Sequence, residues 1–425
     1  MRILVITRNA WDDSNSIGNT ISNFFQGLPD IEFANIYFRS ANPNNKLCQK
    51  YYQVTEIDIL KHWFVPSRIG RSFEIDKQFD KTEKKEAVEK REKNIISFIH
   101  RFGFKLIYCF SDFLWNSCRW INDDLQKFIE SFAPDLIFTF VKAAPQYYQT
   151  ISFLRKKYQI PLMTFIADDE YSGYLMHNQK RKIDNLKYIL SESSVVTGCS
   201  EEICTYYNSL FNCNATPLYK GCELILPSKE HSNDSLTIVY AGNLLCGRLD
   251  IIQKISDLIE DYSFNNNKKI NFEIYSNTHL SSIEVSRLSD NKKCTFFMGR
   301  KPYEDIKKRL SGSNLVLFAE SFIKSEIIKT KYSFSTKIID YLQSGSAIVS
   351  VGPSEIASIK YLKRIPGVFV IDNLDSLKSE LTYVLDNNQN YNKRAEQIFL
   401  FAKEKHDPIK LKNELRMLLS QAVDC

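Results

Sequence analysis

Residues 335–353 read STKIIDYLQSGSAIVSVGP, and their pattern is the strongest indication of the fold in this sequence. Two hydroxyl residues and a lysine lead into a short apolar helix pattern, which breaks at Gly345. The run Ala347–Val351 follows, and its nearly continuous apolar character is typical of a buried parallel strand. A second such run, Leu315–Ala319, precedes the stretch and ends at Glu320. A helix between two buried strands is the repeating unit of an α/β fold.

The same alternation of apolar strands and amphipathic helices extends along the whole chain. In the first half we expect strands at Ile3–Thr7, Ile31–Phe38, Leu136–Phe140, Leu162–Ile166 and Val195–Thr197. In the second half we add Leu236–Tyr240, Phe272–Tyr275, Thr295–Met298 and Val368–Ile371. A polar segment rich in helix breakers, residues 221–235, separates the halves. We therefore predict Rossmann-like domains at 1–220 and 236–390, a linker at 221–235, and a C-terminal helix over 391–425 with a break near Pro408.

Composition excludes several classes of protein. The 425 residues are 44% hydrophobic and 25% charged, which excludes a disordered or collagen-like chain. A net charge of +6 permits attraction to phosphates or an anionic membrane but does not indicate nucleic-acid binding. The first residues lack a signal-peptide pattern and no apolar run reaches 18 residues, so we expect a cytoplasmic protein. Neither the ten cysteines nor the six histidines have the spacing of metal ligands, so we predict no metal site.

Ligands of open α/β sheets bind beyond the carboxyl ends of the strands, so the loops at these ends are candidate sites. After the first strand, a polar loop reaches Gly18 and Asn19 at the start of a helix pattern, whose free N–H groups could face an anion. This loop is not a Gly-x-Gly-x-x-Gly fingerprint, which removes the main support for a dinucleotide dehydrogenase. An ordinary capped helix start explains the loop equally well.

Three carboxylates follow the strand at 162–166: Asp168 and Asp169, then Glu170. One of them could act as a base or accept a hydrogen bond from a hydroxyl group. A helix N-terminus enriched in acidic residues is the alternative, and the sequence does not separate the two interpretations.

In the second half, the strand at 236–240 runs into a loop that contains Gly242, Asn243 and Arg248. Gly242 would let the backbone approach a ligand closely, and an arginine is a natural bidentate partner for a phosphate. After the strand at 295–298, two cations and an aromatic residue, Arg300, Lys301 and Tyr303, occupy the same edge of the expected sheet.

The opening stretch combines these features. Ser335 or Thr336 can cap the helix, and first-turn N–H groups together with Lys337 would cradle a diphosphate. Asp340 lies three residues after Lys337, hence on the same helical side, where it could accept from ribose hydroxyls. A capped helix with an internal Lys–Asp pair is the alternative. The position between two buried strands favours the ligand-binding interpretation.

Four passages resemble GT-B glycosyltransferases, most of all glycosyltransferase family 4 and its relatives in bacterial surface-polysaccharide assembly. They are residues 16–20, residues 240–248, residues 299–303, and residues 335–353. The resemblance implies two Rossmann-like domains that face a central cleft, with the acceptor on the N-terminal domain and a nucleotide sugar on the C-terminal one. It also implies that the final helix crosses back to the N-terminal domain.

The resemblance further assigns roles to individual residues. Arg248 and Lys337 would neutralise the donor diphosphate, Asp340 would bind the ribose, and Glu320 matches the first acid of the family's paired-glutamate motif. Two departures stand out. The second acid is Asp340 rather than glutamate, after a longer segment than usual. The family's acceptor-side histidine is also absent, and Asp168 lies in its neighbourhood.

The predicted activity is a metal-independent hexosyltransferase without a cofactor, which moves a sugar from a nucleoside-diphosphate sugar to a glycan, with retention favoured over inversion. The glycan would be lipid-linked, within bacterial surface-polysaccharide synthesis at the inner membrane face. The predicted residues are, for catalysis, Asp168, Asp169 and Glu320; for the diphosphate, Gly242, Asn243, Arg248, Ser335, Thr336 and Lys337; for the nucleoside, Arg300, Lys301, Tyr303 and Asp340; for the acceptor loop, Gly18 and Asn19. A non-catalytic nucleotide-sugar-binding module and a GT-B sugar-nucleotide epimerase are the alternatives.

One stretch departs from the α/β rhythm. Residues 77–101 are dense in lysine, arginine and glutamate, and residues 95–120 combine aromatic side chains with Arg101, Lys105 and Arg119. Such a stretch could lie in a membrane interface. A charged helix that leads into ordinary core packing is the alternative, and we favour it because charge runs usually mark solvated faces.

Overall fold

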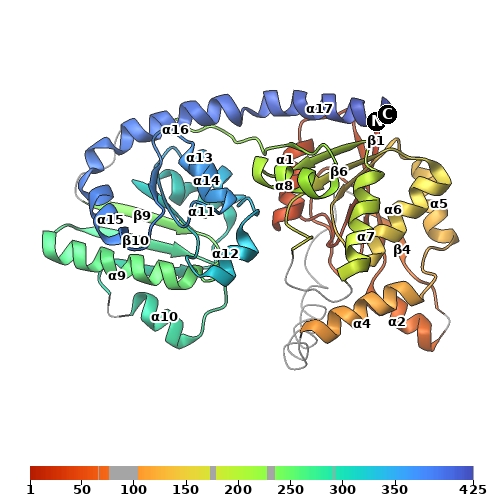
Figure 1. Ribbon diagram of the computed structural model, residues 1–425, viewed down its shortest axis with the longest axis horizontal. Helices are drawn as coiled ribbons and strands as arrows, with labels where there is room; N and C mark the ends of the chain where they lie inside the picture. Colours follow the sequence, from red (N-terminus) through yellow and green to blue (C-terminus); the bar gives the residue numbers. More distant parts are fainter. Residues whose placement is uncertain (66, 76–103, 173–178, 227–234, 291, 425) are drawn as a thin grey trace. The chain divides into compact units, whose positions relative to one another are not determined.

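The computed structural model describes residues 1–65, 67–75, 104–172, 179–226, 235–290 and 292–424, with the backbone alone at 104–108 (Figure 1). The chain divides into two compact units, Met1–Leu218 with Lys412–Cys425, and Tyr219–Leu411. Most of the predicted linker, at 227–234, and the charged stretch at 77–101 lie outside the described residues. Residues 221–226 belong to the second unit, and within them Cys222 is fully buried whereas Glu223 and Leu226 are exposed.

The first unit is built on an eight-stranded sheet of order β4-β3-β2-β1-β5-β6-β7-β8, in which only β3 and β4 pair antiparallel. The strands are β1 (Arg2–Thr7), β2 (Glu32–Tyr37), β3 (Lys50–Gln53), β4 (Arg71–Glu74), β5 (Leu136–Phe140), β6 (Leu162–Ile166), β7 (Val195–Gly198) and β8 (Thr216–Pro217). The helices are α1 (Ser16–Phe25), α2 (Glu56–Phe64), α4 (Phe104–Ser117), α5 (Asp123–Phe132), α6 (Pro145–Tyr158), α7 (Gln179–Ser191) and α8 (Glu201–Phe211).

Helices cover both faces of this sheet, because the side chains of its central strands are apolar on both sides. On one face, Leu4 and Ile6 of β1 pack with α4, α5 and α6. On the other face, Ile3 and Val5 pack with α1 and with the C-terminal helix α17 (Pro408–Asp424). Strand β1 alternates between two cores, as the period of two in a strand requires.

The second unit contains a six-stranded parallel sheet of order β11-β10-β9-β12-β13-β14. Its strands are β9 (Leu236–Ala241), β10 (Ile270–Tyr275), β11 (Thr295–Gly299), β12 (Leu315–Ala319), β13 (Ala347–Val351) and β14 (Phe369–Ile371). Its helices are α9 (Arg248–Asn266), α10 (Ser282–Ser289), α11 (Tyr303–Ser311), α12 (Lys324–Thr330), α13 (Lys337–Leu342), α14 (Ala357–Lys363), α15 (Leu377–Asp386) and α16 (Tyr391–Lys405). Helices α9, α10 and α15 cover one face, and α11 to α14 with α16 cover the other.

These topologies fix where a site can form. The order of strands reverses between β1 and β5 in the first unit, and between β9 and β12 in the second. Loops leave the sheet in opposite directions at such a reversal, so the carboxyl ends of the two strands are the favoured place for a ligand. The predicted α/β class and every predicted strand are confirmed to within two residues. Among the described residues, no helix has the length and apolar character needed to cross a membrane.

Candidate functional site

The predicted donor-binding residues follow strands of the second unit at their carboxyl ends. Arg248 begins α9 after β9, Glu320 directly follows β12, and Lys337 begins α13 ahead of β13. Because β9 and β12 are neighbours at the reversal of strand order, Arg248 and Glu320 meet there although 72 residues separate them. This is the edge at which open parallel sheets bind ligands.

An ion pair joins Arg248 and Glu320 across the reversal. Arg248 Nη2 donates to Glu320 Oε1 at 2.8 Å, and Nη1 donates to Asn243 Oδ1 at 2.9 Å. The side chains of Glu320 and Arg248 are 3% and 16% exposed. Glu320 Oε2 is buried and accepts no hydrogen bond from the residues that the structure describes. The pair therefore holds one carboxylate oxygen whose hydrogen-bonding capacity is unused.

Burial dominates the electrostatics of this pair. It raises the pKa of the Glu320 carboxyl, and the Arg248 guanidinium opposes the shift without cancelling it. For Arg248, burial lowers the pKa, but the Glu320 carboxylate outweighs burial and the pKa ends above its ordinary value. A hydroxyl group that donates to Glu320 Oε2 would satisfy the remaining acceptor, which is costly to leave unpaired in the interior.

Glycines permit the close packing of loops around the pair. Gly247 has φ +71°, and a Cβ added there would lie 2.5 Å from Ser321 Oγ. A Cβ added at Gly352 would lie 2.9 Å from Glu320 Cβ. At the predicted ligand-approach residue Gly242, an added Cβ would lie 2.8 Å from the Tyr240 hydroxyl oxygen. Packing within the protein thus accounts for all three glycines, including Gly242.

A second polar cluster surrounds Asp340. Tyr303 Oη donates to Asp340 Oδ1 at 3.0 Å, which brings two of the predicted nucleoside residues together. Burial raises the pKa of the Asp340 carboxyl, and the nearby Lys337 and Lys220 ammonium groups lower it in part. Burial also lowers the pKa of Lys220 to about 8, against the effect of Asp340. Lys220 was not among the predicted site residues, because a single lysine outside any motif has no distinguishing pattern.

The local structure at Ser335 and Thr336 differs from the prediction. Neither hydroxyl caps α13: Thr336 is the residue before the helix and makes no side-chain capping bond. Instead, Ile338 N donates to the Ser335 backbone oxygen at 3.1 Å, and Ser335 N donates to Ser358 Oγ at 3.0 Å. The predicted side-chain cap is therefore wrong. Within the part of the chain that the structure describes, Lys337 forms no ion pair with Asp340 either, so the alternative of an internal Lys–Asp pair is not seen.

Arg300 and Lys301 lie apart from these contacts. Both side chains are exposed just after β11, the edge strand of the sheet. Across residues 235–290 and 292–424, neither forms an ion pair or a hydrogen bond through its side chain. Their predicted role at the nucleoside stays a prediction. The described residues also contain no group of three or more His, Cys, Asp or Glu arranged to hold a metal ion.

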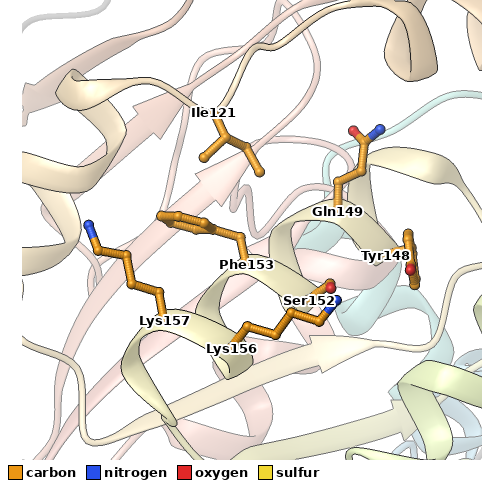
Figure 2. A pocket seen from close by; sticks show the side chains of 7 residues that line it. All are labelled: Ile121, Tyr148, Gln149, Ser152, Phe153, Lys156 and Lys157. Atoms are coloured by element: carbon orange, nitrogen blue, oxygen red, sulfur yellow. The ribbon is translucent and has the colours of Figure 1, made fainter.

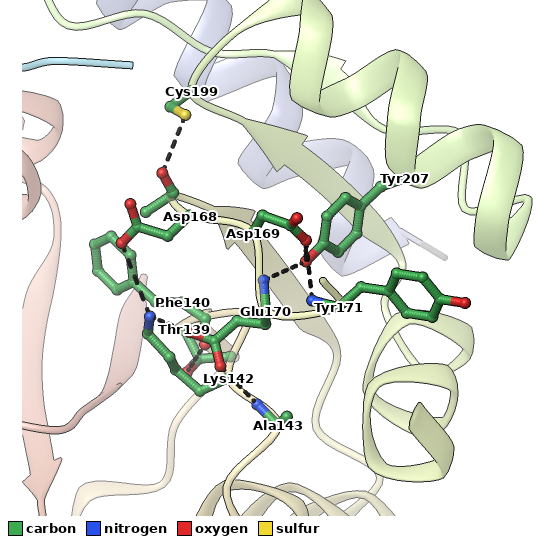
Figure 3. Close-up of polar contacts among 11 residues, drawn as sticks. Thr139, Phe140, Lys142, Ala143, Asp168, Asp169, Glu170, Tyr171, Cys199 and Tyr207 are labelled. Atoms are coloured by element: carbon green, nitrogen blue, oxygen red, sulfur yellow. Dashed lines mark hydrogen bonds and ion pairs between the residues drawn. The ribbon is translucent and has the colours of Figure 1, made fainter. Parts of the chain in front are cut away.

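In the first unit, a lysine organises the acidic loop after β6 (Figure 3). Lys142, just beyond β5, lies with its Nζ 2.6 Å from Glu170 Oε1 and 4.0 Å from Asp168 Oδ2. Burial lowers the pKa of Lys142, but Glu170 and then Asp168 outweigh it, so the pKa is raised. The Asp168 side chain is 60% exposed and the Lys142 side chain only 18%. Lys142 therefore anchors the loop and leaves Asp168 accessible to solvent.

Asp169 turns toward α8 instead. Its Oδ1 accepts from Tyr171 N at 2.9 Å and from Tyr207 Oη at 3.4 Å, and its carboxylate also accepts from Ser172 Oγ. Burial raises the pKa of Asp169. No helix begins at these acids in residues 167–172, so the alternative of an acidic helix N-terminus is wrong. The bonds of Asp169 stabilise the loop, which makes Asp168 the better placed of the two predicted catalytic residues.

The predicted loop at Gly18 and Asn19 is a capped helix start. Asn15 Oδ1 accepts from Gly18 N at 2.8 Å and caps α1. A Cβ added at Gly18 would lie 2.1 Å from the Asp12 carbonyl oxygen, so the helix packs directly on the preceding turn. One of the N–H groups expected to face an anion is thereby already satisfied. A role of this loop toward the acceptor stays a prediction.

A surface groove of about 440 Å³ runs along the outer side of α6 (Figure 2). Its lining residues are Ile121, Tyr148, Gln149, Ser152, Phe153, Lys156 and Lys157. None of them was predicted as a site residue, and none is a carboxylate. The groove therefore lacks the combination of cations and acids that both sheet edges provide.

Known proteins resemble this chain in structure rather than in sequence. No known family profile and no curated protein sequence matches it. HepE from Anabaena superposes with a TM-score of 0.62 at 11% identity, covering 99% of each chain. Sucrose-phosphate synthase from Thermosynechococcus elongatus gives 0.63 at 10% identity, covering 99% of this chain and 98% of its own. A glycosyltransferase from Rickettsia africae gives 0.58 at 12% identity, covering 99% and 98%.

The chain has the GT-B fold. The similarity covers nearly the full length of this chain and of each of these structures, so it includes both units. The predicted fold class is thereby confirmed. That the two domains face one another across a cleft, and that the chain belongs to family 4 within this fold, stay predictions.

Proposed function

We propose that this GT-B protein is a glycosyltransferase that takes its sugar from a nucleoside-diphosphate sugar. The observation that carries the proposal is the buried Arg248–Glu320 pair, with its unpartnered Glu320 Oε2, at the reversal of strand order in the second sheet. HepE, a structural relative, is described in complex with UDP and glucose and also with UDP-glucose. These complexes support a nucleotide sugar as the ligand of the corresponding fold here.

Different residues of the second unit would bind the nucleoside diphosphate and the sugar of the donor. Arg248 and Lys337 place positive charge where the leaving diphosphate develops negative charge. The Asp340–Tyr303 cluster offers a carboxylate to ribose hydroxyls, and Glu320 Oε2 offers an acceptor to a hydroxyl of the sugar. Since side-chain cations provide the compensating charge, the proposed reaction proceeds without a metal or a cofactor. We propose a hexosyl group as the transferred unit.

The first unit would then present the acceptor. We propose a glycan, lipid-linked and part of bacterial surface-polysaccharide synthesis, because the resemblance of the sequence motifs is greatest to such enzymes. Asp168 would lie next to the acceptor hydroxyl, since Lys142 holds its loop and its carboxylate is exposed. Retention of configuration follows from the same resemblance.

The test combines donor binding with sugar transfer. Thermal unfolding is measured with a panel of nucleoside diphosphates and their sugars, because a ligand of the native state raises the apparent stability. Transfer of radiolabelled sugar from the stabilising donor to lipid extracts is then followed for wild type, Arg248→Ala and Lys337→Ala. Lys268→Ala, an exposed lysine just ahead of β10 at the opposite edge of the same sheet, is the matched control.

We expect the first two variants to lose transfer and the control to keep it. Donor binding by wild type without any transfer would favour a non-catalytic binding module. Release of an altered sugar in the absence of acceptor would favour an epimerase.

A further inference from the structure

Helices α2 and α4 of the first unit carry an exposed apolar surface, which we call the aromatic face. The residues of this face are each 47% to 79% exposed to solvent, far more than core residues. The members are Trp63, Phe64, Val65, Phe110 and Phe113. Contiguous exposed apolar surface of this kind marks an interaction site rather than ordinary surface. α2 and α4 lie side by side in Figure 1.

The aromatic face is continuous across the two helices. The rings of Trp63 and Phe113 meet edge to face, with centroids 5.5 Å apart. Phe110 lies three residues before Phe113, hence on the same side of α4. Phe64, the last residue of α2, and Val65, its C-cap residue, follow Trp63 directly in the chain.

The two helices already have a complete inner face, so core packing does not explain the outer one. Ile59 of α2 and Leu114 and Trp115 of α4 are buried in the core of the first unit. Ser111 Oγ donates to Glu56 Oε1 at 2.6 Å and ties the helices together. The basic–aromatic stretch at 95–120 is therefore divided: Trp115 is core, against the membrane interpretation, whereas Phe110 and Phe113 are exposed.

Two exposed cations lie near the aromatic face. Lys61 of α2 and Arg119 just beyond α4 are exposed, and neither side chain forms a hydrogen bond or ion pair within residues 1–65, 67–75 and 104–172. The acids of the two helices are half-buried: Glu56 accepts from Ser111 of α4, Asp58 forms a capping box with Thr55, and Asp112 lies between Phe110 and Phe113. Lys61 and Arg119 thus offer positive charge to a negatively charged partner.

We propose that the aromatic face docks on an anionic lipid bilayer, and this inference rests on the proposed function, in which the acceptor is lipid-linked. Apolar side chains at a helix end can enter the acyl boundary while neighbouring cations remain at the headgroups. Only one of the five side chains, the Trp63 indole, can form a hydrogen bond. A protein interface carries many hydrogen-bonding groups among its apolar ones, so this composition favours lipid.

Vesicle flotation tests the proposal with full-length protein. Vesicles contain phosphatidylcholine alone or with about one third phosphatidylglycerol, a composition at which a few cations already add measurably to binding. We expect wild type to float with the mixed vesicles, and the binding to weaken as salt rises. Phe64→Ser/Phe113→Ser should reduce the bound fraction by about tenfold, since apolar burial is lost. Lys61→Glu/Arg119→Glu should remove the preference for phosphatidylglycerol.

Phe264→Ser is the matched control, because Phe264 is 85% exposed on α9 of the other unit. It should float like wild type. Thermal shift by UDP-glucose is measured on every variant. A retained shift shows that the variant is folded and keeps the donor site, so membrane docking and the proposed function are tested separately.

Three results would overturn the proposal. The first is folded wild type that stays at the bottom of the gradient with mixed vesicles. The second is equal flotation of wild type and Phe64→Ser/Phe113→Ser. The third is self-association of wild type that the same double substitution abolishes, without any flotation, since the face would then bind protein.

Discussion

The Arg248–Glu320 pair leads to a specific prediction for Arg248→Met. The substitution leaves the Glu320 carboxylate buried with both oxygens unpaired, because Oε2 has no partner even in the wild type. Removing one partner of a buried pair costs about 3–5 kcal/mol of unfolding free energy. We expect a loss of this size at neutral pH, measured by urea denaturation and far-ultraviolet circular dichroism. Lys268→Met, which breaks an exposed pair with Asp386, should cost less than about 1 kcal/mol.

The pH dependence separates this mechanism from a general packing defect. Burial already raises the pKa of Glu320 above 4.5, and loss of Arg248 raises it further. Between the unfolded and folded pKa values, the folded state binds a proton that the unfolded state lacks, so stability falls as pH rises. The loss caused by Arg248→Met should therefore be smaller at about pH 5 than at about pH 8.

A double substitution completes the test. Arg248→Met/Glu320→Leu removes both charges and should recover most of the lost stability, because apolar residues of similar volume often replace a buried pair at little cost. A loss below about 1 kcal/mol in the single variant, or a loss that grows toward acid pH, would refute the reasoning.

Three further predictions concern other parts of the chain. Folding lowers the pKa of Lys220 from 10.5 to about 8, so between these pH values the unfolded state binds a proton that the folded state lacks. The stability of wild type relative to Lys220→Met should therefore rise with pH across this window, by up to about 3 kcal/mol. A difference in denaturation midpoints that does not change with pH would contradict this. Leu419→Ala, at a site 1% exposed in α17, should cost about 2–5 kcal/mol, whereas Met417→Ala, 74% exposed, should be neutral in the same denaturation assay. Gly18→Ala should lower the thermal unfolding temperature, with a cost of about 1–3 kcal/mol, because its Cβ would meet the Asp12 carbonyl oxygen; an unchanged transition would show that the loop yields freely.

The sequence predicted the buried parallel strands well for a physical reason. Strands such as Leu136–Phe140 and Leu315–Ala319 are covered on both faces, so nearly all of their residues are apolar. The strands β3, β4 and β8 escaped prediction. They are two to four residues long, and Lys50–Gln53 and Arg71–Glu74 begin and end with polar residues. β4 and β8 are also the edge strands of the sheet.

The candidate site could be predicted in part for a related reason. In a parallel sheet the residues just after strands share one edge, which made Arg248 and Asp168 candidates from their positions. Glu320 became a candidate through the resemblance to the paired-glutamate motif. Their partners could not be predicted in the same way. The contact of Arg248 with Glu320 depends on which strands are neighbours, and the contact of Lys142 with Glu170 joins loops 28 residues apart. A capped helix start, by contrast, was one of the two interpretations of the loop before Gly18, and Asn15 provides this cap.

The last helix has a consequence for the order in which the protein forms. Leu415, Leu419 and Ala422 of α17 are fully part of the core that contains Ile3 and Val5. Domains generally fold in the order of their synthesis, N-terminal first. Here the first unit lacks part of its interior until α17 has left the ribosome, whereas the second unit, Tyr219–Leu411, is synthesised before most of α17. The second unit is thus the first whose sequence has been fully synthesised. In the nascent chain, the apolar surface of the first unit that α17 covers stays exposed until α17 has been made.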